Sequence, residues 1–133
     1  MKTFFALYGI AASVFLLIDT IWLTTVANSF YKAKLGKLLA AKPDFIAAGL
    51  FYAIYIIALV VFIIKPGLDQ SLYTVAWKGA LLGLAMYATY DLTNQATLKD
   101  WPRIVTMVDL LWGTFITAIV SIITVFIYTK FIS

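Results

Sequence analysis

The amino-acid sequence predicts an all-helical integral membrane protein, built as a bundle of four transmembrane helices in a single domain. Of its 133 residues, 64 % are hydrophobic and 12 % are charged, whereas a soluble domain is about 45–50 % apolar and about 25 % charged. The hydrophobic residues also gather in four long stretches that are joined by short polar connections. Almost the whole chain is therefore needed to cross the membrane, and no soluble domain is expected.

The four stretches are long enough to span a bilayer, because a helix of about 20 mostly apolar residues crosses a hydrocarbon core of about 30 Å. They cover residues 4–28, 45–64, 72–98 and 104–131. The start of the first stretch has features of a secretory signal peptide, but its apolar residues continue past Asp19, so we expect this span to be retained. Turn residues at Lys65-Pro66-Gly67 and around Pro102 separate the later spans.

The segment between the first two spans, residues 29–44, mixes lysines with apolar residues such as Tyr31 and Leu35. This pattern predicts a short amphipathic helix that lies at the membrane interface. The second span offers only Tyr52 and Tyr55 as polar side chains. We therefore expect it to be the most lipid-exposed of the four.

Basic residues divide unevenly between the two sides of the membrane. Four spans bring both termini to one side, so the first and third connections share the other side and carry Lys32, Lys34, Lys37, Lys42, Lys99 and Arg103. The termini and the second connection carry Lys2, Lys65 and Lys130, and Lys78 is added to this set if it lies at the interface. The positive-inside rule therefore predicts that both termini lie outside.

The residue inventory excludes whole classes of chemistry. The chain has no Cys and no His, and all six acidic residues are Asp. Disulfides, catalysis by a thiol or a Ser-His-Asp triad, and ligation of zinc or haem by these side chains are therefore excluded, and no cofactor is evident. The net charge of +4 belongs to lysines that flank the spans, so we expect membrane lipids and no nucleic acid as partners.

Three aspartates lie inside apolar spans, where an Asp near the helix centre costs about 2.5–3.5 kcal/mol, and such residues are functional candidates. They are Asp19, Asp91 and Asp109. Counted from the ends of the predicted spans, all three lie roughly 8–14 Å from the same membrane face. The sequence therefore predicts one buried acidic layer.

Polar residues surround this layer on two spans. On the last turns of the third span, Tyr90, Asn94 and Gln95 accompany Asp91, so we expect this helix end to be enclosed by protein or to line a wet cavity. The fourth span carries a polar stripe with helical spacing, which should face the bundle. The stripe consists of Thr106, Asp109, Gly113, Thr117, Ser121, Thr124 and Tyr128.

A short pattern occurs twice in the chain, as Asp19-x-x-Trp22-x-Thr24 and as Asp109-x-x-Trp112-x-Thr114. Residues three apart are neighbours on a helix surface, so each helix can present a carboxylate beside an indole. Because the two spans are antiparallel, we expect the two tryptophans to point in opposite directions from the acidic layer. The pair Gly79-x-x-x-Gly83 is a motif for close helix packing, which we expect within the bundle.

Two carboxyl groups that approach closely cannot both ionise cheaply, so at least one of them should carry a proton or face a cation. Lys99 and Arg103 are the nearest candidates in the sequence for such a partner. A metal site formed by Asp19, Asp91 and Asp109 is a second way to neutralise the layer, and oxygen ligands suit Mg²⁺ or another divalent cation.

The most distinctive strings of the chain are Thr89-Tyr90-Asp91-Leu92-Thr93-Asn94 with Ala96-Thr97, Asp109-x-x-Trp112-Gly113, and Asp19-Thr20-Ile21-Trp22. With these strings the chain resembles a family of small four-helix bacterial membrane proteins, the domain of unknown function two-one-seven-seven. The resemblance covers essentially the whole chain. It implies a multi-pass protein of the bacterial inner (cytoplasmic) membrane, and it implies no activity or catalytic residue.

We therefore expect a small transport or ligand-binding bundle whose acidic layer binds a proton, a cation or the polar head of an amphiphile. The expected binding residues are Asp19, Trp22, Tyr90, Asp91, Asn94, Gln95, Asp109 and Trp112. A metal-assisted enzyme that modifies lipids is a less favoured alternative, and a structural or assembly subunit is another. Assembly as a homodimer stays open.

Overall fold

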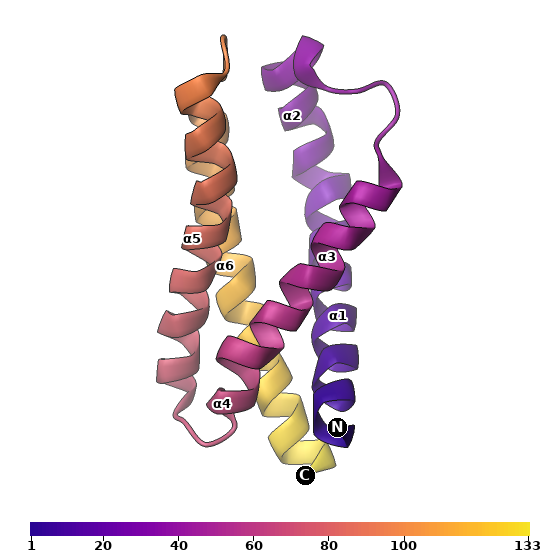
Figure 1. The fold of residues 1–133 in the computed structure, drawn as a ribbon, viewed down its shortest axis with the longest axis vertical. Coiled ribbons are helices and arrows are strands. Elements are labelled where there is room, and N and C mark those ends of the chain that lie inside the picture. Colours follow the sequence, from indigo (N-terminus) through magenta and orange to yellow (C-terminus); the bar gives the residue numbers. More distant parts are fainter.

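The computed structural model describes residues 1–133 and contains helices without any β-strand, which confirms the all-helical class (Figure 1). The chain forms four long helical segments. The first consists of α1 (Lys2–Trp22), the π-helical turn η1 (Leu23–Ala27), α2 (Asn28–Leu35) and the 3₁₀ turn η2 (Gly36–Leu38). The others are α3 (Phe45–Leu59) with η3 (Val60–Ile64) and α4 (Lys65–Gly67), α5 (Leu72–Thr97), and α6 (Arg103–Ile127) with η4 (Tyr128–Ile132).

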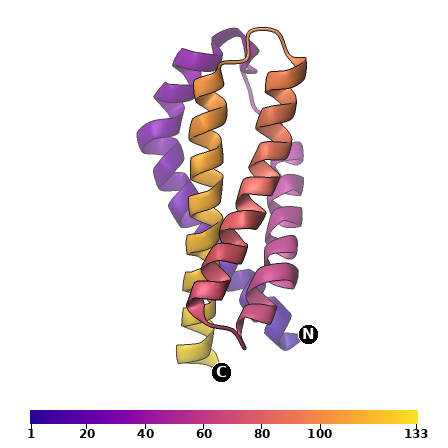
Figure 2. The same cartoon turned by 90° about the vertical axis from the view of Figure 1, so that its left-hand side faces the viewer.

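The four segments alternate in direction, so both termini lie at the same end of the molecule (Figure 1). α5 and α6 run beside each other, and the contacts between them are the most extensive in the fold (Figure 2). α3 crosses obliquely in front of α1 and α6 (Figure 1). At the end opposite the termini, the helices stand further apart.

The first helical segment is longer than the sequence predicts. Helical backbone runs through Lys2–Leu38, 37 residues, or about 55 Å at 1.5 Å per residue. A separate interfacial helix within residues 29–44 is therefore a wrong prediction, because α2 continues the first helix. The hydroxyls of Thr24 and Thr25 donate to carbonyl oxygens one turn earlier at 2.8 and 2.6 Å, so polarity here does not end the helix. Its α-helical part ends at Leu35, and Gly36, which begins the 3₁₀ turn, has a φ of 42° that favours glycine.

The later helices begin at residues that cap their free backbone N–H groups. The Asp44 carboxylate accepts hydrogen bonds from the backbone N–H groups of Ile46 and Ala47, both at 3.1 Å, at the start of α3. The Ser71 hydroxyl accepts from the N–H of Thr74 at 3.2 Å at the start of α5. Asp, Asn and Ser are favoured at these positions for this reason.

Three helical segments are long and apolar enough to cross a membrane: Lys2–Leu38, Phe45–Gly67 and Arg103–Ile132. The predicted third span forms a helix of 26 residues, α5, but this helix is not among the three. It contains Lys78, Asp91 and several Tyr and Thr residues, which lower its mean hydropathy. Three of the four predicted spans thus satisfy the length and composition of a membrane helix.

Glycines allow α5 and α6 to approach closely. A Cβ atom added to Gly79 would lie 3.1 Å from the Cα of Ala118, and one added to Gly83 would meet the carbonyl oxygen of Gly113. The expectation that Gly79-x-x-x-Gly83 packs within the bundle is therefore confirmed. Gly9 and Gly49, by contrast, have nothing within 4 Å of such an atom.

The polar stripe of α6 faces the bundle as expected. Thr106, Asp109, Thr117, Ser121 and Thr124 are all buried, and Tyr128 is half-buried. The hydroxyls of Thr117 and of Tyr55, on α3, are 2.5 Å apart and form a buried hydrogen bond.

The second span is not the most exposed one, contrary to the prediction, because the first segment has a smaller buried share. α3 and η3 contribute a whole face to the core, namely Tyr55, Ile56, Leu59, Val60, Ile63 and Ile64.

Candidate functional site

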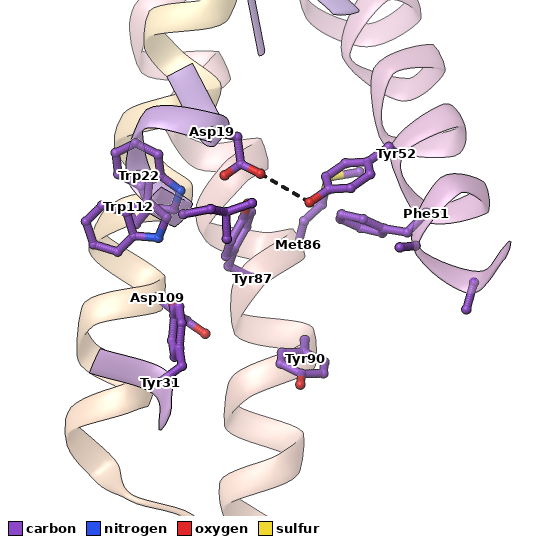
Figure 3. Close-up of a pocket in the computed structure, with 13 residues that line it drawn as sticks. Asp19, Trp22, Tyr31, Phe51, Tyr52, Met86, Tyr87, Tyr90, Asp109 and Trp112 are labelled. Carbon is purple, nitrogen blue, oxygen red and sulfur yellow. Dashed lines mark hydrogen bonds between the residues drawn. The ribbon is translucent and has the colours of Figure 1, made fainter. Parts of the chain in front are cut away.

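A cavity of about 670 Å³ lies between the first helical segment, α3, α5 and α6 (Figure 3). We call it the aromatic cavity, because seven of its 13 lining residues are aromatic: Trp22, Tyr31, Phe51, Tyr52, Tyr87, Tyr90 and Trp112. Two carboxyl groups, those of Asp19 and Asp109, also line it, together with Leu23, Ala47, Ala48 and Met86. No Lys or Arg is among the lining residues. The volume falls within the range of about 300–1,000 Å³ that is typical of ligand pockets.

Asp19 is held at the wall of the aromatic cavity by a contact between two spans. It lies in the last turn of α1 and is 7 % exposed. The hydroxyl of Tyr52, from α3, donates a hydrogen bond to its Oδ2 at 3.1 Å (Figure 3). The tyrosine therefore partly replaces the water that the carboxylate loses on burial.

Asp109 has an equivalent arrangement on α6. It is 8 % exposed, and the hydroxyl of Tyr31 donates a hydrogen bond to its Oδ1. Tyr31 reaches Asp109 because α2 continues the first helix along the bundle (Figure 3). Each carboxylate of the aromatic cavity is thus bound by one tyrosine from another helical segment.

The indole rings of Trp22 and Trp112 stack on each other, with ring centroids 4.3 Å apart and planes inclined by 10°. We call these two residues the Trp pair. Both members of the repeated Asp-x-x-Trp pattern therefore meet at one place, although the sequence predicted that the tryptophans would point in opposite directions. In Figure 3 the Trp pair lies between Asp19 and Asp109, because the two antiparallel helices present their patterns in reverse order.

The three intramembrane aspartates consequently do not form one layer. Asp91, on α5, neighbours Asp109, whereas Asp19 lies beyond the Trp pair. The predicted depth of Asp19 was wrong because it was counted from residue 28 as the end of the first span, whereas the helix continues to Leu38. No group of three acidic residues is arranged to hold a metal ion, so the predicted three-aspartate metal site is not formed.

Asp91 is the most deeply buried of the three. It has no exposed surface, and neither of its carboxylate oxygens has a hydrogen-bond partner. It is not among the residues that line the aromatic cavity. Asp91 therefore lies behind the cavity wall, next to Asp109.

The expected binding residues divide into three groups. Five of the eight line the aromatic cavity: Asp19, Trp22, Tyr90, Asp109 and Trp112. Asp91 lies behind its wall. Asn94 and Gln95 are half-buried near the end of α5 and are not part of the lining. Lys99 and Arg103 are exposed, and the expectation that they neutralise the carboxylates is wrong for Asp91, whose oxygens have no partner.

Sequence reasoning missed the other aromatic residues of the cavity. Tyr31 stands among lysines in a segment that we assigned to the interface, and Tyr52 and Phe51 belong to a span that we expected to face lipid. A weak signal existed on α5, where Met86, Tyr87 and Tyr90 share one helix face through their spacing of three and four residues. This spacing indicates a common helix face, but it does not indicate which other helices that face contacts.

Aromatic faces and carboxylates together attract positive charge. A ring attracts a cation through the negative potential of its face, and the attraction increases when water is excluded. The aromatic cavity offers both kinds of group and no internal cation, so its chemistry suits a positively charged ligand with apolar substituents.

One of three comparisons with known proteins gives a match. The family model described as "Predicted membrane protein (DUF2177)" matches residues 4–126. No curated protein matches the chain, and no solved structure matches it. Because the family model covers most of the chain, the chain belongs to this family of predicted membrane proteins.

Proposed function

We propose that this membrane protein is a ligand-binding or transport bundle, and that the aromatic cavity binds a small organic cation or the cationic head of an amphiphile. The composition of the lining carries the proposal: two carboxyl groups and seven aromatic side chains face one cavity without any basic side chain.

Charge supports this proposal first. Asp19 and Asp109 each have one tyrosine hydroxyl as a side-chain donor, and both are almost completely buried. An ionised carboxylate with so few donors is costly inside a membrane protein. A bound cation lowers that cost, because opposite charges attract more strongly where water is excluded.

The Trp pair favours an organic cation over a metal ion. A divalent metal ion needs several oxygen ligands around one point, and the two lining carboxylates lie on opposite sides of the Trp pair (Figure 3). An alkylated or arylated cation contacts aromatic faces directly, and each such contact contributes about 0.5–2 kcal/mol. The same ligand can place its charge near either carboxylate.

The proposal includes a placement in the membrane. α5 would also cross the bilayer, as the third of four spans, because its 26 residues extend about 39 Å and it packs against α6 along its length. The basic residues of the first and third connections would then lie in the cytoplasm and both termini outside, in the bacterial inner membrane. The aromatic cavity lies nearer these connections, so it would open toward the cytoplasmic half.

Equilibrium dialysis tests the proposal with a defined probe. Tetraphenylphosphonium is a cation with four apolar substituents and no hydrogen-bonding group. We expect saturable binding of about one probe per chain to the purified protein in detergent. Asp19→Asn and Asp109→Asn should each weaken binding by about tenfold or more, because each removes one negative charge from the cavity wall.

A matched control makes the same chemical change elsewhere. Asp69 lies exposed in the turn between α4 and α5, so Asp69→Asn should bind the probe as the wild type does. Equal binding by all variants would mean that the probe binds the outer apolar surface, and it would contradict the proposal. Absence of saturable binding, with all variants as stable as the wild type, would favour a structural or assembly subunit.

A further inference from the structure

Two carboxyl groups with different surroundings meet where α5 packs against α6. Asp91 is completely buried, and both of its oxygens lack a hydrogen-bond partner. Asp109 neighbours it from α6, accepts a hydrogen bond from Tyr31 and lines the aromatic cavity. We call Asp91 and Asp109 the carboxyl pair. Asp109 thus connects the cavity to a carboxyl group that a ligand does not reach.

No positive charge compensates the carboxyl pair. The titratable groups that act on it are Tyr31 from α2 and Tyr87 and Tyr90 from α5 itself, and all three are tyrosines. Lys99 and Arg103, which flank the connection between α5 and α6, are exposed. η3 and α4 also pack against α5, but at the end near the chain termini, and Lys65 there is exposed as well (Figure 1).

Two negative charges on the carboxyl pair would raise its free energy strongly. Two carboxylates that share a site repel each other, and a buried carboxylate without donors loses its solvation without replacement. One proton on the pair removes one of the two charges and gives the protonated group a donor for its neighbour. Asp91 is the better site for that proton, because Tyr31 already donates to Asp109.

We propose that the carboxyl pair holds one proton when the aromatic cavity is empty and releases it when a cation binds, so that the site exchanges a proton for a cation. This inference rests on the proposed function. In the empty state the pair has one proton and a charge of −1. When a monovalent cation enters beside Asp109, the O–H bond of Asp91 breaks and its proton passes to water. The pair then has a charge of −2 beside a ligand of +1, so the net charge of pair and ligand is the same as before.

Proton release on binding tests the exchange directly. Tetraphenylphosphonium is added to the purified protein in a weakly buffered detergent solution that contains a pH indicator. We expect close to one proton released per bound cation. Binding and protonation are linked, so the dissociation constant of the probe should fall about tenfold for each unit of pH increase, over the range in which the empty pair is protonated.

Asp91→Asn is the informative variant, because an amide has the shape of a protonated carboxyl group and no proton to release. We expect this variant to bind the probe with an affinity that does not depend on pH and to release no proton. The matched control is Asp100→Asn, at an exposed position with a φ of 64°, which Asn tolerates well. It should release the proton as the wild type does.

Infrared difference spectroscopy gives a second readout on the wild type, which decides the matter even when Asp91→Asn does not fold. The carbonyl band of a protonated carboxyl group should disappear when the probe binds. Binding without proton release, with an unchanged carbonyl band, would contradict this inference and leave the proposed function standing. Absence of binding would contradict the proposed function, and the exchange with it.

Discussion

A single methyl group at Gly83 should destabilise the protein, because this glycine lies where α5 and α6 approach most closely. In Gly83→Ala the new Cβ would meet the carbonyl oxygen of Gly113 and lie 2.5 Å from the Oγ1 and 2.7 Å from the Cβ of Thr117. The Cβ of Thr117 would have to retreat by about 0.7 Å to reach the 3.4 Å at which ordinary contact begins. The carbonyl oxygen cannot rotate away, so the helices must separate, at a cost of about 1–3 kcal/mol.

The matched control for this change is Gly9→Ala, since nothing lies within 4 Å of the new atom there. Both substitutions gain the same helix propensity, at most about 1 kcal/mol, so the difference between the variants isolates the clash. Unfolding in mixed micelles, followed by circular dichroism, should show Gly83→Ala to be less stable than Gly9→Ala by about 1–3 kcal/mol. Equal stability of the two variants would refute the close packing of α5 on α6.

Three further predictions concern single contacts. Tyr55→Phe removes the buried hydrogen bond to Thr117 and should lower the free energy of unfolding by about 0.6 kcal/mol and at most about 1.7 kcal/mol. A double-mutant cycle with Thr117→Val measures the coupling energy of the two side chains, and a coupling energy of zero would contradict the bond. Asp44→Ala removes the cap of α3 and should lower the free energy of unfolding by about 0.5–2 kcal/mol, whereas Asp44→Asn should change it little. Equal losses of stability for the two variants in chemical denaturation would argue against capping. Trp22→Leu removes one aromatic face and should weaken binding of tetraphenylphosphonium roughly 2- to 30-fold in equilibrium dialysis, and unchanged affinity would place the probe elsewhere.

The sequence was sufficient to predict what depends on local pattern. Hydropathy predicted the long helices, and a spacing of three and four residues predicted that the stripe from Thr106 to Thr124 would face the bundle. The same spacing identified the repeated Asp-x-x-Trp pattern, and all four of its Asp and Trp residues line the aromatic cavity. These features follow from helix geometry alone, so they needed no knowledge of the tertiary arrangement.

What the sequence did not predict depends on where helices end and how they cross. The first helix continues to Leu38, which brings Tyr31 to Asp109 and places Asp19 on the other side of the Trp pair. The oblique crossing of α3 brings Tyr52 to Asp19. Asn94 and Gln95 were predicted as binding residues but do not line the aromatic cavity. Polar residues near a helix end also occur simply because the helix approaches water there.

The most direct test of the account is the position of a bound cation. Tetraphenylarsonium has the shape of the phosphonium probe and contains an arsenic atom, which anomalous diffraction from crystals of the complex can locate. We predict one arsenic peak inside the aromatic cavity, beside the Trp pair and between Asp19 and Asp109. Arsenic peaks confined to the outer apolar surface, with none in the cavity, would contradict the claim that this cavity is a cation site.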